Sequence, residues 1–316
     1  MSAPACGIVP DVQLKSVLVA TDFSAVSRKA LHHALAIARH YGAKLYAMHV
    51  VSSLGLTIAG PDAIGQSTIA ALREATLTER KLVASGALRG IHHQVIVRPG
   101  QIWAELQAVI REEAVDLLVI GTHGRTGLKR LVLGSVAEQI FRNARCPVLT
   151  VGPSSPPDGV FTPGETPRPI LFATDFSAAS LNALPYAASF ANQRRSELVL
   201  AHMLSPVPPV KDGRWYNASD VAKMRLVAQK NAQKRLSDLV ADAMLTVKPA
   251  FMVDFGEPAE GILRAMEAEH AELIVMGLMC RKHVETMSHL PWSTAYDIVC
   301  HAGCPVLTVR GGNPWE

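Results

Sequence analysis

Short apolar runs alternate with longer stretches of helical periodicity along the first half of this chain. The apolar runs are rich in Val, Ile and Leu on both faces, as in buried parallel strands, and they are Ser16–Ala20, Lys44–Val50, His92–Val97, Asp116–Ile120 and Val148–Val151. The helical stretches between them cover residues 26–41, 66–89, 101–114 and 135–144. Five strands that alternate with four helices predict a doubly wound, five-stranded parallel α/β sheet of Rossmann-related type. Ligands of such sheets bind beyond the carboxyl ends of the strands, where the strand order reverses.

The second half of the chain repeats the first. VLVATDFSA at 17–25 returns as ILFATDFSA at 170–178, and His49 is matched by His202, both with an offset of 153 residues. The string CPVLTV closes both halves, at an offset of 158. Ordered matches of this kind indicate a tandem duplication. We therefore expect a first copy at 1–152, a Pro/Gly-rich linker of partly extended character at 153–169, and a second copy at 170–316.

Length and composition agree with two globular domains. The chain has 316 residues, of which 49% are hydrophobic and 18% charged, and its net charge is +4. This small charge gives no reason to expect a nucleic-acid partner. The N-terminus has no signal-peptide pattern, and no apolar run approaches the roughly 18 residues of a membrane span. We expect a cytoplasmic protein without a membrane partner.

The cysteines do not predict a metal centre or a disulfide framework. There are five, an odd number, and Cys146 and Cys304 occupy matching positions of the repeat. Cys280, His283, His289, Cys300 and His301 are close in sequence to Cys304, but their spacing fits no standard zinc pattern. We expect reduced thiols and no metal site.

The loop after the fourth strand of the first copy carries a glycine pattern suited to phosphate. Gly121, Gly124, Gly134 and Ser135 form G-x2-G-x9-G-S. Glycine lets the backbone approach a ligand closely, and the N–H groups at the start of the helix near Ser135 attract anions. Ser135 is itself a plausible N-cap. The chain has no Walker A motif and no G-x-G-x-x-G after the first strand.

On these residues the chain resembles the universal stress protein family, and specifically its ATP-binding branch. The resemblance covers nearly the whole chain in two copies and rests on the glycine pattern together with Asp22 at the end of the first strand. It implies that ATP is bound in the first copy. Mg²⁺ is the ion that would accompany this ATP if it were hydrolysed. The resemblance assigns the phosphates to Gly124, Gly134, Ser135 and Val136, the ribose to Asp22, the adenine to Thr21 and Val50, and the pocket floor to Gly121 and Thr122.

Each assignment has an alternative that the sequence leaves open. The TDFSA string persists in the second copy, so Thr21, Asp22 and Ser24 could simply cap the first helix. The glycine loop could be a structural turn. The basic residues of the loop could contact phosphate or form a solvated stretch, and they are Arg125, Lys129 and Arg130. His123 is not accompanied by an obvious nucleophile, so we assign no catalytic residue.

The second copy departs from the pattern. Counted back from Cys304, Ser293 matches Ser135, but Trp292 replaces Gly134 and Cys280 replaces Gly124. The loop is also two residues longer and contains Pro291, which lacks an N–H group. We expect that the second copy does not bind ATP by this route and is structural or binds something more apolar.

These observations leave three functions to compare. The first is a nucleotide-dependent stress-response module, the second a weak ATPase and the third a structural scaffold. Hydrolysis needs a water-positioning base, and no motif clearly supplies one. Because PVLTV ends both copies, we also expect the copies to pair within the chain through their last strands, in a pseudo-two-fold arrangement. A homodimer of such chains is a further possibility.

Overall fold

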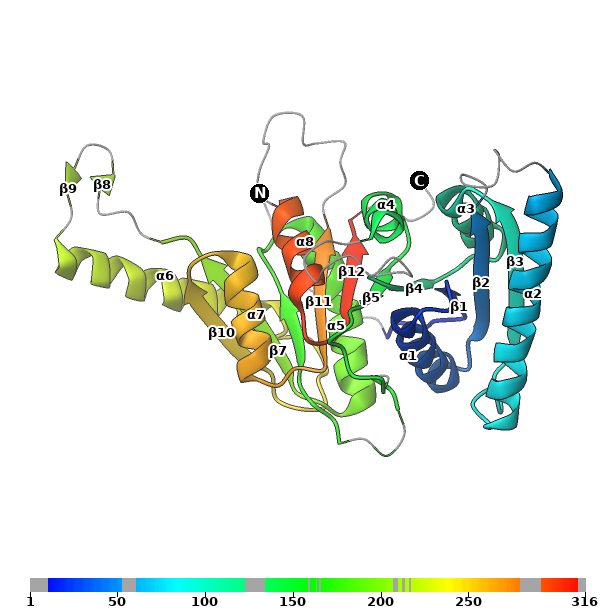
Figure 1. The fold of residues 1–316 in the computed structure, drawn as a ribbon. Helices are drawn as coiled ribbons and strands as arrows, with labels where there is room; N and C mark the ends of the chain where they lie inside the picture. The colour runs from blue at the N-terminus through cyan, green and yellow to red at the C-terminus, as the bar shows by residue number, and fades with distance from the viewer. Residues whose placement is uncertain are drawn as a thin grey trace. The chain divides into compact units, whose positions relative to one another are not determined.

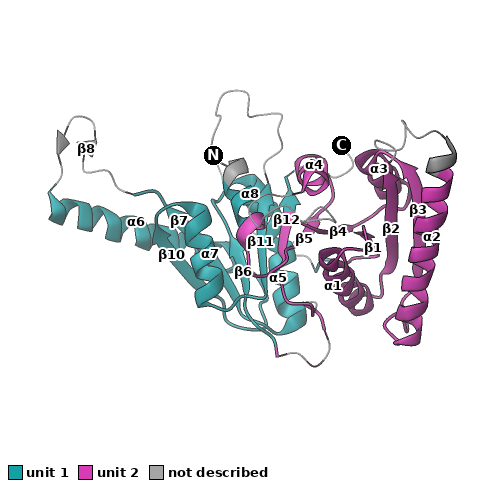
Figure 2. Ribbon diagram, in the orientation of Figure 1, with its two compact units in different colours: residues 1–12, 167–298, 309–312 teal, residues 13–166, 299–308, 313–316 magenta. Residues whose placement is uncertain are grey.

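The computed structural model describes residues 11–52, 61–122, 134–158, 160–162, 164, 166–206, 210–211, 214–215, 217–278 and 291–311. These residues divide into two compact units (Figure 2). One unit contains the first copy, as residues 13–166 together with 299–308. The other contains most of the second copy, as residues 167–298 together with 11–12 and 309–311. The compact units therefore do not coincide with the two copies. Residues 299–308 of the second copy belong to the unit of the first copy, and residues 11–12 of the first copy belong to the other unit.

The first copy has the alternating order that its apolar pattern predicts (Figure 1). Its elements are β1 (Ser16–Ala20), α1 (Ala25–Tyr41), β2 (Lys44–Ser52), α2 (Pro61–Ala84), β3 (His93–Gly100), α3 (Ile102–Glu112), β4 (Leu117–Gly121), α4 (Ser135–Asn143) and β5 (Val148–Val151). The helix α2 ends five residues earlier than predicted. Gly86 and Gly90 follow it with φ of 74° and 76°, in the left-handed region that ends helices.

The strands of the first copy form a parallel sheet. β1 pairs with β2 and β4, β2 pairs with β3, and β4 pairs with β5, all in parallel. The strand order is β5-β4-β1-β2-β3, so the direction of winding reverses between β1 and β4. Residues Leu117–Ile120 of β4 are at most 2% exposed, which explains why this strand is apolar on both faces. The predicted fold class is confirmed.

The second copy repeats this order. Its elements are β6 (Ile170–Ala173), α5 (Ala178–Arg194), β7 (Leu198–Leu204), a small hairpin of β8 (Val210–Lys211) and β9 (Arg214–Trp215), α6 (Ala218–Leu239), β10 (Ala250–Phe255), α7 (Pro258–Ala268), β11 (Leu273–Leu278), α8 (Pro291–His301) and β12 (Val306–Arg310). β7 and β11 pair in parallel with β6, and β10 pairs in parallel with β7. After β12 the chain returns to β11, because the Gly311 N–H donates to the Leu278 carbonyl.

The repeated VLTV string pairs with itself. Within the unit that contains the first copy, Val306, Leu307 and Thr308 lie opposite Thr150, Leu149 and Val148 in antiparallel register. The Thr150 hydroxyl donates to the Val306 carbonyl at 3.1 Å, and the Thr308 hydroxyl donates to the Val148 carbonyl at 3.3 Å. This reciprocal pair of bonds follows from antiparallel pairing of two identical strings. The expected pairing of the last strands is present.

The Pro/Gly-rich segment after β5 packs against α1, which the sequence did not predict. The Lys29 ammonium donates to the carbonyls of Pro153 and Ser155, at 2.6 and 2.8 Å. Phe161 is 5% exposed and its ring stacks on His40 at 4.3 Å between centroids. The first part of the linker is therefore held on its own domain.

Candidate functional site

The strand β1 ends in a tight turn formed by Thr21, Asp22, Phe23 and Ser24. The Thr21 hydroxyl accepts the Phe23 N–H at 3.0 Å, and the Asp22 Oδ1 accepts the Ser24 N–H at 3.0 Å. The Ser24 hydroxyl then caps α1 by accepting the N–H of Ser27 at 3.1 Å. Phe23 has φ of 63°, which is unusual for an aromatic residue and costs about 1–3 kcal/mol. The side-chain hydrogen bonds compensate for this cost and fix the turn.

His49 holds this turn from the neighbouring strand. Its Nδ1 lies 2.7 Å from the Thr21 carbonyl, and because a carbonyl can only accept, Nδ1 carries the proton. The imidazole also contacts the Phe23 ring, at 4.7 Å between centroids. The sequence repeat aligns His49 with His202, but it did not predict that His49 hydrogen-bonds to the turn.

The start of α4 lies at the end of β4, as the glycine pattern predicts. The Gly134 N–H donates to the Thr122 carbonyl at 2.9 Å. Gly134, not Ser135, is the N-cap of α4, and within the described residues no side-chain hydrogen bond caps this helix. The prediction that Ser135 is the N-cap is therefore wrong, because Ser135 is already the first helical residue. The first amides of an uncapped helix are directed toward any ligand beyond that end.

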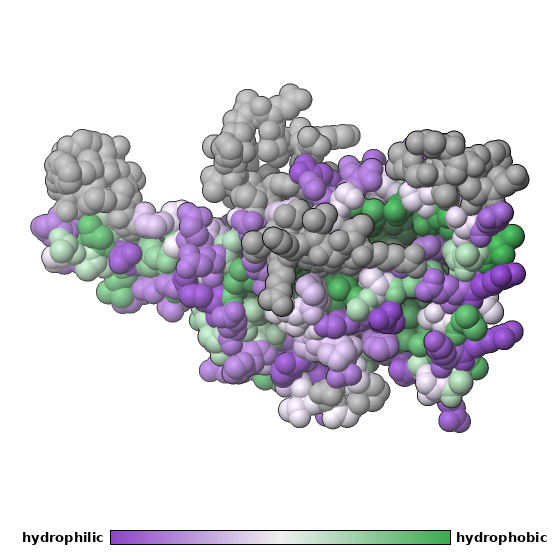
Figure 3. Space-filling view, in the orientation of Figure 1, coloured by the Kyte–Doolittle hydropathy of each residue, from purple (hydrophilic) through white to green (hydrophobic). Residues whose placement is uncertain are grey.

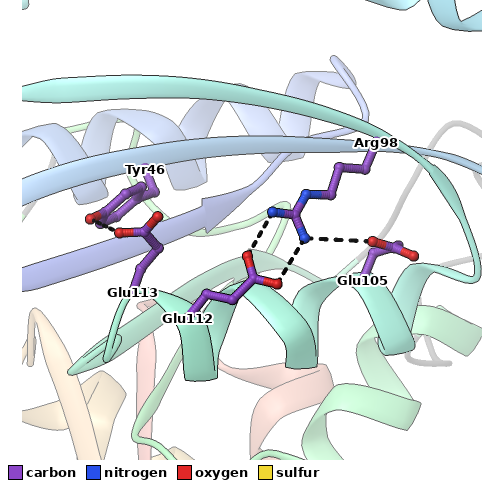
Figure 4. A network of polar contacts seen from close by, with 5 residues as sticks. All are labelled: Tyr46, Arg98, Glu105, Glu112 and Glu113. Atoms are coloured by element: carbon purple, nitrogen blue, oxygen red, sulfur yellow. Dashed lines mark hydrogen bonds and ion pairs between the residues drawn. The ribbon is translucent and has the colours of Figure 1, made fainter.

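A network of polar side chains ties α3 to the strands beside it (Figure 4). The Arg98 guanidinium on β3 donates to both carboxylate oxygens of Glu112, at 3.3 and 2.7 Å, and lies 3.8 Å from Glu105. The Tyr46 hydroxyl on β2 donates to Glu113 at 2.5 Å. Burial, together with this bond to Glu113, raises the pKa of Tyr46. These contacts fix the helix that supplies Ile102 and Leu106 to the cavity described next.

A cavity of about 210 Å³ lies at the carboxyl ends of β1, β2 and β4. Its walls come from these strands and from α3 and α4, and the surface between the two helices is hollowed and hydrophobic (Figure 3). It lies at the reversal of strand order, which is the usual place for a ligand in this architecture. Eight of the ten predicted site residues line it: Thr21, Asp22, Val50, Gly121, Thr122, Gly134, Ser135 and Val136.

The other two predicted residues, Gly124 and Arg125, lie outside the described residues, as do His123, Lys129 and Arg130. The described residues thus form only part of the predicted site. The sequence did not predict the apolar walls of the cavity, which are Ala20, Met48, Ile102, Leu106, Ile120, Ala137 and Ile140. No local signal distinguishes these side chains from ordinary core residues.

The second copy repeats the turn. Thr174, Asp175 and Ser177 accept the corresponding N–H groups at 3.0, 2.9 and 3.2 Å, and Phe176 has φ of 62°. The His202 Nδ1 lies 2.8 Å from the Thr174 carbonyl. Burial raises the pKa of Asp175, but the hydrogen bonds from Ser177 and Ser180 outweigh it and leave the pKa below its ordinary value. The turn by itself therefore does not distinguish the two copies.

The cavity above this second turn has a different wall. It measures about 230 Å³ and is lined by Met203 and Met276, where the first copy has Val50 and Ile120. The Met203 side chain packs closely against α7 at Gly261. A Cβ added at Gly261 would lie 2.3 Å from the Met203 sulfur. The helix α8 begins at Pro291, two residues before the serine that matches Ser135. The amide-bearing end of this helix is therefore displaced along the chain relative to α4.

Comparison with known proteins identifies the family. The sequence model of the universal stress protein family matches residues 13–152 and again 167–310. The chain belongs to the universal stress protein family. It is 36% identical over 141 residues to the universal stress protein MJ0531 of Methanocaldococcus jannaschii, an alignment that covers 43% of this chain and 81% of that protein.

Two relatives match nearly the full length. A universal stress protein of Mycolicibacterium smegmatis is 26% identical over 306 residues, which cover 93% of this chain and 96% of that protein. The crystal structure of a universal stress protein from Archaeoglobus fulgidus has a TM-score of 0.64 at 22% identity, and the alignment covers 95% of this chain and all of that one. The tandem arrangement therefore also occurs in other members of the family.

Three further observations bear on the predicted properties. Among the described residues, no helix has the length and apolar character that crossing a membrane requires. No group of three or more potential metal ligands occurs in the part of the chain that the structure describes, and Cys280, His283 and His289 lie outside it. Cys146 is buried, and this burial raises the pKa of its thiol to about 12.

Proposed function

We propose that this universal stress protein binds ATP in its first copy and acts as a nucleotide-dependent stress-response module, while its second copy does not bind ATP. The observation that carries the proposal is the placement of Asp22, Val50 and the start of α4 around one cavity at the reversal of strand order. This set combines a carboxylate for ribose hydroxyls, an apolar wall for a base, and helix amides for phosphates.

The residues present fit the chemistry of ATP in the first copy. Gly134 has φ of −57°, so its backbone does not itself require glycine. A Cβ at this position would nevertheless lie 3.3 Å from the Thr122 carbonyl oxygen, and a larger side chain would have to project toward the cavity. We infer that glycine is needed here for room, and in sequence the second copy has the much larger Trp292 at the matching position.

A dedicated hydrolase is less well supported. Asp22 is the carboxylate among the described residues that line the cavity, and its Oδ1 already accepts the Ser24 N–H. A general base would need a free oxygen near the terminal phosphate. Slow hydrolysis with Mg²⁺ remains the alternative activity, and a scaffold without nucleotide remains the alternative function.

The test is calorimetric titration of a nucleotide-free preparation with ATP, with and without Mg²⁺. We expect one site per chain and a loss of roughly 100-fold or more in affinity, about 2.7 kcal/mol, in Gly134→Trp. Ser135→Ala should weaken binding, and the matched control Ser293→Ala should leave it unchanged. Two sites per chain, or full affinity in Gly134→Trp, would contradict the assignment to the first copy. No binding to the wild-type chain would favour the scaffold.

A further inference from the structure

The first copy contains a second and larger cavity on the opposite face of its sheet. It measures about 510 Å³ and lies among α1, α2, β2 and β3. We refer to it as the α1–α2 cavity. This volume falls within the roughly 300–1,000 Å³ of small-molecule sites. The 210 Å³ cavity that we propose for ATP is lined instead by α3 and α4, and we refer to it as the nucleotide cavity.

The alternation of side chains along β2 separates the two cavities. Leu45 and Ala47 line the α1–α2 cavity, Met48 and Val50 line the nucleotide cavity, and His49 borders both. Successive residues of a strand point to opposite faces of a sheet, so both cavities are built on one strand. On β3, Val95 pairs with Ala47 and also lines the α1–α2 cavity.

Small side chains keep this space open. Ala47 stands in the middle of β2 and is only half-buried. Its counterpart in the second copy, 153 residues later, is Leu200, which is fully buried at 0% exposure. Across the cavity, α2 contributes Ala75. A leucine at either position of the first copy would occupy the space.

The walls favour an apolar ligand. Leu31, Leu45, Leu82, Leu88 and Val95 supply hydrocarbon surface, and the Phe23 ring forms part of the wall at the turn after β1.

Several of the polar groups in the lining are already bonded within the protein, and His32 and Lys81 also belong to the lining. The His93 Nε2 lies 3.0 Å from the Glu79 carboxylate, the Arg28 guanidinium donates to the Phe23 carbonyl at 2.7 Å, and the Thr78 hydroxyl donates to the Glu74 carbonyl at 2.9 Å. A ligand therefore gains mainly by burying apolar surface there.

The outer side of the cavity is also apolar. Leu77 lines the cavity and is 56% exposed, and Ile69, Leu72 and Val83 of α2 are exposed by more than half. In Figure 3, hydrophobic and hydrophilic colours alternate over α2 at the right edge of the view. Exposed apolar side chains of α2 thus lie beside the cavity, where Glu74, Glu79 and Lys81 also form part of the lining.

We propose that the α1–α2 cavity is a binding site for one uncharged, ring-containing apolar molecule. A ring system fits because the Phe23 and His49 rings already form a tilted pair at the cavity wall, and aromatic rings pack favourably in offset or tilted pairs. The site goes beyond the proposed nucleotide function and does not depend on it.

The test uses N-phenyl-1-naphthylamine, an uncharged fluorescent ring compound, titrated against the full chain without nucleotide. We expect saturable binding of one molecule per chain. Ala47→Leu, which imports the second-copy residue, should weaken binding at least tenfold, and Ala75→Leu should do the same from the side of α2. Unfolding midpoints of both variants show whether the fold is kept, and a filled cavity predicts unchanged or higher midpoints.

Two controls assign the probe to this cavity. Ala20→Leu adds the same atoms to the nucleotide cavity, which Ala20 lines, and Gly134→Trp blocks the proposed phosphate end. Both should bind the probe as the wild type does. Absence of saturable binding to the wild type, wild-type affinity in folded Ala47→Leu and Ala75→Leu, or loss of binding in either control would overturn the proposal. Because ATP binding is measured separately by calorimetry, failure of one site does not imply failure of the other.

Discussion

The turns after β1 and β6 match bond for bond, yet the surfaces above them differ. Both use a threonine, an aspartate and a serine to accept the same three N–H groups, and both hold a phenylalanine at φ near 60° against a histidine. The turn is therefore part of the scaffold. The two copies differ in the residues that line the cavities above the turns, Val50 against Met203 and Ile120 against Met276, and in sequence Gly134 is matched by Trp292.

The two copies thus share the framework of the turn and differ in the residues that line the cavities above it. The turn is constrained because each of its hydrogen bonds supports a backbone conformation that is costly without them. A residue that only faces a cavity has fewer partners in the fold. If one copy alone binds nucleotide, the other can lose its glycine and gain bulk without unfolding.

The largest expected difference between the copies concerns Gly121, the last residue of β4, and Gly277, the next-to-last residue of β11. A Cβ at Gly277 would lie 2.1 Å from the Ala179 carbonyl oxygen, whereas at Gly121 the nearest atom is a Val26 methyl at 3.0 Å. Gly277→Ala must displace backbone and should cost roughly 3 kcal/mol or more, while Gly121→Ala should cost about 1 kcal/mol. Chemical unfolding of the two variants measures the difference. Equal midpoints would show that α5 and α1 approach their strands equally closely.

The next difference is sensitivity to acid. His33 on α1 is 1% exposed, its Nε2 donates to the Pro156 carbonyl at 3.1 Å, and its buried Nδ1 has no hydrogen-bond partner among the described residues. Burial lowers the pKa of His33 from 6.5 to about 4. The unfolded chain therefore binds more protons between pH 6.5 and 4, so the free energy of unfolding falls as the pH falls through this window and changes no further below it.

The loss attributable to His33 should be about 3 kcal/mol at most. His33→Gln keeps a donor for the Pro156 carbonyl and should reduce this pH dependence. The second copy has Tyr186 at the matching position and lacks this particular term. Hydrogen exchange of peptides from α1 and α5, compared at pH 7 and pH 5, measures both copies in one sample. A wild-type pH dependence in His33→Gln would rule out His33 as its source.

A smaller effect separates the two roles of Asp22. Asp22→Ala and Asp175→Ala should each cost about 1 kcal/mol, because each removes the acceptor of one turn hydrogen bond. Only Asp22→Ala should also weaken ATP binding, by roughly tenfold. Since hydrogen bonds depress the pKa of Asp175, the ionised form stabilises the fold above the unfolded pKa, and this contribution is lost as the pH falls through the folded pKa. If Asp22→Ala leaves the ATP affinity unchanged, Asp22 stabilises the turn and does not contribute to ATP binding.

The smallest effect concerns exposed charges that join strand to helix. In the first copy Arg98 on β3 meets Glu112 on α3, and in the second the charges are exchanged, with Asp254 on β10 at 3.6 Å from Arg264 on α7. Arg98→Ala and Asp254→Ala should each lower the unfolding midpoint slightly. The difference from wild type should shrink in about 1 M salt, where the screening length is about 3 Å. An effect that persists in salt would point to packing by the Arg98 stem instead.

Much of this molecule is determined locally by its sequence. The period of apolar residues predicted the strands and helices of the first copy, and the repeat predicted the same order in the second. The glycine spacing predicted that Gly134 and Ser135 start a helix at the end of β4 near Gly121. These predictions succeed because the direction of a side chain in a strand, and the chain path at a strand–helix junction, depend on neighbouring residues.

The remaining features depend on contacts between distant parts of the chain. Phe161 and the Nδ1 of His33 are buried by residues far apart in sequence. His49 borders both cavities for the same reason. The α1–α2 cavity exists because Ala47 and Ala75, each ordinary in its own element, face the same space. Local propensity cannot anticipate such a coincidence, since a void is a property of packing among several elements and of no single segment.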